Sequence, residues 1–275
     1  MAILLSLAAA LAYGLSDFVG GLASRRTSAW PVAFVATAAA FVGSLGLALV
    51  TDGSPTRTDL LWGALAGVGT GAGGAFLYRG LAAGRMGVVA PISAVGAALV
   101  PVCVGVVTGE RPALLVWLGI AAAVPGIWLV SQEQGSGGDL AAGILDGVLA
   151  GLGFGLLFAA MGQIPEEAGF APLAVAQAAG LVCVAVTATV LGGRWVPSDR
   201  SQAWGILAGV LGTAAVVAFL LATQTGLLTV ASVVTSLYPA ITVGLAAFVL
   251  RERIHLSQGV GLVLCGVAVG LVAAA

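Results

Sequence analysis

The chain has 275 residues, of which 60% are hydrophobic and 8% are charged. A soluble domain carries roughly 25% charged residues, and a disordered chain combines low hydrophobicity with high net charge, so the composition excludes both classes. The net charge of −1 comes from 10 basic and 11 acidic residues with no basic run, which argues against nucleic acid as a partner. The composition predicts a protein whose surroundings are a lipid bilayer.

Ten apolar segments follow one another along the chain, separated by short polar interruptions. Each is close to the length of about 20 residues that a helix needs to cross a bilayer. The strands of a membrane barrel alternate over about 10 residues, whereas these segments are longer and uniformly apolar, so each is predicted to be a helix that satisfies its own backbone. The predicted spans are 3–23, 29–50, 60–82, 87–108, 112–131, 140–163, 170–192, 202–224, 229–250 and 256–274.

The second half of the chain repeats landmarks of the first half at a constant spacing of 142 residues (252 − 110). The related pairs are Gly84 with Gly226, Glu110 with Glu252, Arg111 with Arg253 and Gly119 with Gly261. Five spans per half is an odd number, so the second half enters the membrane from the opposite side. The sequence therefore predicts an all-α membrane protein of ten transmembrane helices in two inverted five-helix repeats, residues 1–135 and 136–275.

Short motifs recur at matching places in the two halves. They are Gly84 to Ala90-Pro91, Pro101, Gly109-Glu110-Arg111 and Gly119, then Ser232, Pro239, Arg251-Glu252-Arg253 and Gly261, with an aromatic-glycine opening at Tyr13-Gly14. Over essentially the full chain this succession resembles the EamA-type fold of the drug/metabolite transporter superfamily. The resemblance implies a central cavity walled by spans 1, 3, 4, 6, 8 and 9, alternating access, and both termini in the cytoplasm.

Three charged side chains fall inside the spans, where each costs about 2.5–3.5 kcal/mol and so marks a candidate functional position. We call the membrane face at which span 3–23 ends the first face, and the opposite one the second face. Asp17, Arg79 and Asp146 all lie within about three to six residues of the first face. At 1.5 Å per residue these depths predict one polar layer roughly 5–10 Å below that face.

Two readings of this layer remain open from the sequence. In the functional reading, Arg79 recognises a carboxylate, and Asp17 or Asp146 recognises an amine or carries a proton. In the structural reading, the charges extend to the interface or form an ion pair. Aspartate has a short side chain that cannot reach far, so the functional reading is favoured for Asp17.

Aromatic and amide side chains supply further candidates for the wall of a substrate site. They are Tyr13, Tyr78, Phe154, Gln224 and Tyr238. Tyr238 is the most suggestive of them, because the proline after it removes a backbone donor and leaves a carbonyl for a cavity or water to satisfy.

Glu110 and Glu252 end the fourth and ninth spans, on opposite faces. Each stands before a new helix, so we expect each to cap the next helix in the chain. The alternative is a carboxylate that takes part in gating or in proton coupling. Glycines at every fourth position, at 63, 67 and 71 and from 143 to 155, predict close helix contacts.

No catalytic, metal or cofactor motif stands out. The three cysteines lie inside apolar spans, His255 is the only histidine, and the glycine-rich run 69–74 follows no strand, so it does not bind a dinucleotide. We therefore predict no cofactor and no metal, and a non-enzymatic secondary transporter. It is expected to export a small organic metabolite such as an amino acid, with a proton as the coupling ion if there is one. An intramembrane enzyme and a non-transporting scaffold are the alternatives, and the sequence leaves the oligomeric state open.

The expected location is the inner membrane of a bacterium, but two arguments disagree on orientation. Eight arginines lie at the first face, and only Arg57 and Arg111 lie at the second. The positive-inside rule then places the first face in the cytoplasm and both termini outside. The family resemblance implies the opposite orientation.

Overall fold

The computed structural model describes residues 1–24, 27–82, 86–131, 140–251 and 254–275. These residues form α-helices and two 3₁₀-helices, Glu166–Ala168 and Arg200–Ala203, and no strand occurs among them. The α-helices are α1 Ala2–Ser24, α2 Ala29–Val50, α3 Arg57–Ala82, α4 Met86–Val107, α5 Leu114–Val130, α6 Leu140–Met161, α7 Ala171–Val190, α8 Trp204–Thr225, α9 Leu228–Thr235, α10 Tyr238–Val249 and α11 Leu256–Ala273.

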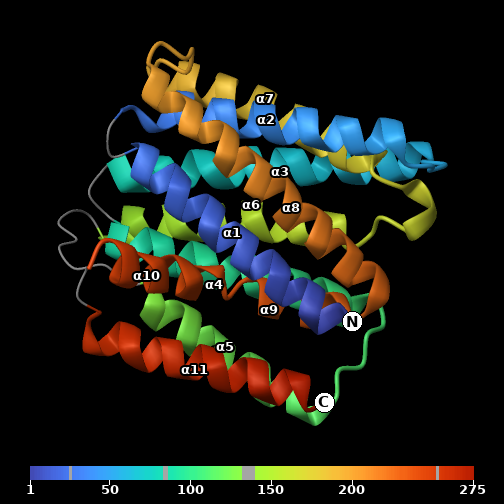
Figure 1. Ribbon diagram of the computed structural model, residues 1–275. Coiled ribbons are helices and arrows are strands. Elements are labelled where there is room, and N and C mark those ends of the chain that lie inside the picture. The colour runs from blue at the N-terminus through green and yellow to red at the C-terminus, as the bar shows by residue number, and fades with distance from the viewer. Residues whose placement is uncertain (25–26, 83–85, 132–139, 252–253) are drawn as a thin grey trace.

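The ten predicted spans correspond to these helices. Within the described ranges, nine segments are long and apolar enough to cross a membrane, with α9 and α10 counted as one segment, Leu228–Val249. The remaining predicted span is the shorter apolar helix α5. Both termini lie at the same end of the bundle (Figure 1), as an even number of crossings requires.

The predicted span 229–250 is not one helix, which corrects the sequence prediction. α9 ends at Thr235, and α10 begins at Tyr238. Pro239 has no backbone N–H, so the carbonyl of Thr235 loses the donor that a continuous helix would give it. The amide of Ser236 still donates to Ser232 at 2.9 Å, and the chain then turns before α10 starts. Two short helices therefore replace one span.

The two halves of the chain pack on each other in reciprocal pairs. α3 lies against α6 and α7, while α8 lies against α1 and α2. α2 with α7 forms one flank of the bundle, and α5 with α11 forms the opposite flank (Figure 1). If α1, α2, α3 and α5 are exchanged with their counterparts α6, α7, α8 and α11, the same set of contacts results. This is expected for inverted repeats.

Glycines set the closest of these contacts. A Cβ atom added at Gly67 in α3 would collide with the carbonyl oxygen of Ala176 in α7, and one added at Gly209 in α8 would collide with that of Ala36 in α2. Gly67 and Gly209 are 142 residues apart, the spacing of the repeat. The same atomic contact thus occurs once in each half, and it depends on a residue without a side chain.

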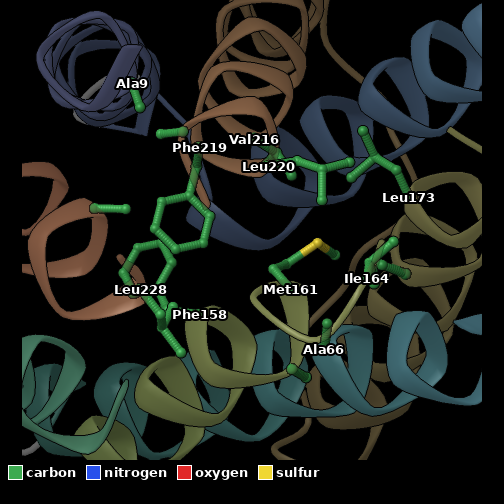
Figure 2. Packing of buried hydrophobic residues seen from close by; sticks show 14 of the residues in the cluster. Ala9, Ala66, Phe158, Met161, Ile164, Leu173, Val216, Phe219, Leu220 and Leu228 are labelled. Atoms are coloured by element: carbon green, nitrogen blue, oxygen red, sulfur yellow. The ribbon is translucent and has the colours of Figure 1, made fainter. Parts of the chain in front are cut away.

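An apolar cluster fills the half of the bundle nearer to the second face. Its buried members come from α1, α3, α4, α6 to α9 and the link between α6 and α7, and we call it the second-face cluster. Figure 2 labels Ala9, Ala66, Phe158, Met161, Ile164, Leu173, Val216, Phe219, Leu220 and Leu228 among them. The rings of Phe158 and Phe219 lie side by side at its centre, with centroids 4.6 Å apart. The interior is therefore packed from the middle of α6 to its end.

Candidate functional site

Aromatic side chains meet an acidic one midway along α1, above the second-face cluster. Tyr13 and Asp17 are one helical turn apart and so lie on the same side of α1. The ring of Tyr13 is 6.0 Å from that of Tyr238, the first residue of α10, and 6.1 Å from that of Phe158 in α6, which it meets edge-on. Asp17 is close enough for its charge to act on both tyrosines. We call Tyr13, Asp17, Phe158 and Tyr238 the tyrosine–aspartate site.

The polar groups of this site have no hydrogen-bond partners among the described residues. The side chain of Asp17 is exposed, and it makes neither a hydrogen bond nor an ion pair within these ranges. The Tyr13 hydroxyl is buried and likewise has no hydrogen-bond partner in the described part of the chain. Buried polar groups normally have partners, so the Tyr13 hydroxyl keeps a hydrogen-bonding capacity that the described residues leave unused.

The sequence brings α1 close to the helix break through Gly14. A Cβ atom at this position would lie 2.5 Å from the Cβ of Ile241 and 3.0 Å from the carbonyl oxygen of Tyr238. The Thr242 hydroxyl donates across the same contact to the carbonyl of Gly14 at 3.3 Å. On the neighbouring side, the Ser16 hydroxyl donates to the carbonyl of Ala208 in α8 at 2.8 Å. These contacts fix the direction in which Tyr13 and Asp17 point.

Arg79 and Asp146, the other two members of the predicted polar layer, lie together. Nε of Arg79 donates to Oδ1 of Asp146 at 2.8 Å, and a terminal nitrogen donates to the same oxygen at 2.5 Å. The guanidinium also lies 4.8 Å from the centre of the Phe76 ring. The Asp146 side chain is 2% exposed and that of Arg79 is 47% exposed, on the wall of a 190 Å³ cleft between α3 and α7. Arg79 thus neutralises a buried carboxylate, and Asp17 stands apart from this pair.

Glu110 caps a helix, but not the one that the sequence predicted. We expected it to cap α5, which follows it, whereas its carboxylate binds the start of α9 in the other half of the chain. Leu228 N–H donates to one oxygen at 2.5 Å and Thr229 N–H donates to the other at 2.9 Å, with the Thr229 hydroxyl as a third donor. α5 begins at Leu114, and its N-cap residue Ala113 provides no side-chain cap. Glu110 therefore joins the end of α4 to the start of α9 at the second face.

The remaining predicted site residues lie elsewhere. Phe154 fills the contact between α6 and α3, where a Cβ atom at Gly73 would be 2.8 Å from its ring. Gln224 donates to the carbonyl of Ile164 at 3.4 Å near the second face. Neither is part of the tyrosine–aspartate site. The side chain of Tyr78 and the whole of Glu252 lie outside the described residues.

Thr229 and Thr242 were not predicted as site residues. Thr229 is the second residue of α9, two positions after the N-cap residue Leu227, so it does not stand at the usual capping position and no local signal marks it. No sequence signal marks Thr242, because its partner Gly14 lies 228 residues away.

The two ends of the bundle differ in how tightly their interior is packed. Toward the second face, the second-face cluster and the Glu110 cap close the interior. Asp17 is exposed and stands eight residues nearer to the first-face end of α1 than Ala9 of the cluster. The exposed carboxylate of the tyrosine–aspartate site therefore lies on the first-face side of the packed interior.

Comparison with known proteins adds a family and a fold. The sequence model of the EamA-like transporter family matches residues 1–132 and 141–274. A solved structure described as "Crystal structure of protein" has a TM-score of 0.70 with 19% sequence identity, and the alignment covers 98% of this chain and 95% of that chain. No curated protein matches the chain. The chain belongs to the EamA-like transporter family.

Proposed function

We propose that this membrane protein is a secondary transporter that exports a small organic metabolite by alternating access of its two halves. Amino acids and related amphipathic compounds are the first substrates to test. The observation that carries the proposal is the position of the tyrosine–aspartate site on the first-face side of a packed interior. The exposed Asp17 carboxylate has no partner among the described residues and stands beside Tyr13 and Tyr238, while the second-face cluster fills the interior beyond them. A solute bound there exchanges with only one side of the membrane, as alternating access requires.

Two further features support this proposal. α9 and α10 form a broken helix beside the site, and broken helices with exposed backbone groups are typical of substrate sites in transporters. Asp17 supports a proton as the coupling ion, because a carboxyl group with no partner among the described residues can bind a proton when the site is empty and release it when a substrate binds. Export and a location in the inner membrane of a bacterium belong to the proposal as well.

The test is uptake and counterflow in proteoliposomes against a panel of amino acids and related metabolites, with and without a pH gradient. Asp17→Asn is expected to lower transport while leaving expression and thermal unfolding unchanged. Asp199→Asn makes the same chemical change in the loop before α8, where Asp199 caps the turn Arg200–Ala203, and serves as the matched control. Normal transport by Asp17→Asn would show that the Asp17 carboxylate is not needed for transport. The absence of transport for every compound of the panel would overturn the proposed function.

The orientation is tested separately. Position 26 precedes α2 in the chain and position 57, which follows α2, begins α3, so a cysteine at each is expected to react from opposite sides of the membrane. Reaction from outside at position 57 would agree with the arginine distribution, and reaction from outside at position 26 would agree with the family resemblance.

A further inference from the structure

We propose that the tyrosine–aspartate site recognises an organic monocation, a protonated amine attached to an apolar or aromatic body, in preference to solutes that carry a carboxylate. This inference rests on the proposed transport function and narrows its substrate class. Three properties of the site support this inference: the charge of Asp17, the aromatic rings, and the Tyr13 hydroxyl, which has no partner among the described residues.

When Asp17 is ionised, the charge of the site is negative. Asp17 has no hydrogen bond or ion pair with any described residue. Arg79, the described arginine inside a predicted span, is paired with Asp146 at 2.5–2.8 Å. Within the described ranges a substrate carboxylate would therefore find no free cation at this depth, and ionised Asp17 would repel it. A substrate ammonium would provide the counter-charge that a carboxylate inside a membrane otherwise lacks.

The rings of the site suit the same ligand. The centroids of Tyr238 and Phe158 both lie about 6 Å from that of Tyr13, which stands one helical turn before Asp17. Phe158 is buried in the second-face cluster, so the partly exposed rings are those of Tyr13 and Tyr238. The electron-rich face of an aromatic ring attracts a cation, and its apolar surface packs against the hydrocarbon part of an amphipathic solute. Aromatic rings give no comparable attraction to an anion.

The carboxylate and hydroxyl oxygens of the site can accept hydrogen bonds from an ammonium group. An alkylammonium group has up to three N–H donors, which need acceptors once water is removed. Asp17 supplies two carboxylate oxygens, and the Tyr13 hydroxyl is a buried oxygen with no partner in the described part of the chain. The carboxylate oxygens are acceptors and the hydroxyl oxygen can act as one, as an ammonium requires.

The experiment uses three probes that share a phenyl ring and differ only in their charged groups. Phenethylamine carries an amine, phenylalanine carries an amine and a carboxylate, and 3-phenylpropionate carries a carboxylate. Binding is measured by scintillation proximity on the purified protein, and uptake is measured in proteoliposomes. Phenethylamine is expected to bind at least tenfold more tightly than phenylalanine, and 3-phenylpropionate is expected not to compete.

The variants connect this preference to the residues. Asp17→Asn is expected to weaken phenethylamine binding at least tenfold, and Asp17→Glu is expected to restore part of it. Tyr238→Leu keeps an apolar side chain but removes a ring, so we expect a smaller loss. Asp199→Asn, remote from the site, is expected to bind like the unmodified protein. Thermal unfolding of each variant in detergent identifies any that fail to fold, and the comparison of Asn with Glu at position 17 is then made between folded proteins.

The outcomes separate this inference from the proposed function. Transport of phenylalanine or 3-phenylpropionate equal to or better than that of phenethylamine would overturn the monocation preference while leaving a transporter. Unchanged phenethylamine binding in Asp17→Asn would overturn the role of the carboxylate. If the protein transports neither these probes nor any compound of the metabolite panel, the proposed function itself fails.

Discussion

The Glu110 cap gives the clearest test of how the second face is held closed. Removing the carboxylate takes the acceptor from two backbone N–H groups and one hydroxyl at the start of α9. A hydrogen bond to a charged group contributes about 1.5–3 kcal/mol, and loss of a helix cap costs about 0.5–2 kcal/mol. Three donors on one carboxylate do not add fully, so we expect Glu110→Ala to cost the closed state about 3 kcal/mol in total.

A change of this size shifts an equilibrium between closed and open second faces by roughly 150-fold. Glu110→Gln keeps one oxygen acceptor but loses the charge, so the expected shift is smaller, roughly tenfold. If the closed state dominates in the unmodified protein, both variants increase the fraction of time in which the interior is accessible from the second face.

The assay is the reaction of a buried cysteine with a membrane-impermeant thiol reagent. Ser232 in α9 is fully buried, and a cysteine there is nearly the same size. The reporter Ser232→Cys is placed in a protein whose own cysteines, Cys103, Cys183 and Cys265, are replaced by alanine. Its reaction rate from the second face is expected to rise about 150-fold with Glu110→Ala if reaction requires opening.

The matched control is Glu166→Gln, which removes a carboxylate from an exposed position in the link between α6 and α7, near the same face. It is expected to leave the labelling rate unchanged. If Glu110→Ala and Glu166→Gln label at the same rate while both remain folded, the cap does not hold the second face closed, and the reasoning is refuted.

Two other predictions concern packing and charge. Arg79→Met removes the arginine that pairs with the 2%-exposed Asp146 side chain and is expected to destabilise the protein by about 3 kcal/mol. Asp146→Leu leaves a half-exposed arginine and is expected to cost less, so equal losses in thermal unfolding would contradict this assignment. Gly67→Ala and Gly209→Ala, which meet equivalent carbonyls in the two halves, are expected to cost similar amounts, about 1–3 kcal/mol each. Gly74→Ala, with open space around it, is the control and is expected to be neutral or slightly stabilising; a loss at position 74 as large as at 67 would refute the packing argument.

Hydropathy and the repeat were sufficient to predict the ten crossings and the two-half fold, because each span must satisfy its own backbone in lipid. The helix break was not predicted at its actual place. Residues 229–250 are uniformly apolar, and Pro239 is compatible both with a bent helix and with the first turn of a new one. The close contact of α10 with α1 at Gly14, which accompanies the second arrangement, cannot be predicted from the sequence.

The candidate site was predicted in part. The depth of a residue in the membrane follows from its position in the chain, so Asp17, Arg79 and Asp146 could be assigned to one level. Depth does not fix the direction in which a side chain points around the helix axis. The structure pairs Arg79 with Asp146 and directs Asp17 toward the tyrosines. The Glu110 cap was assigned to the wrong helix because sequence neighbours are known in advance, whereas partners across the inverted repeat are not.

The division of one crossing into α9 and α10 also has a mechanical consequence. A continuous helix transmits tilt and rotation from one end to the other, because every turn is bonded to the next. Pieces of 8 and 12 residues, separated at Ser236 and Leu237, do not transmit them in this way. α9 can remain clamped by Glu110 while α10, which carries Tyr238, moves on its own. In the proposed transporter, the two ends of the substrate pathway can therefore open one after the other. The pathway then need never be open to both sides of the membrane at the same time.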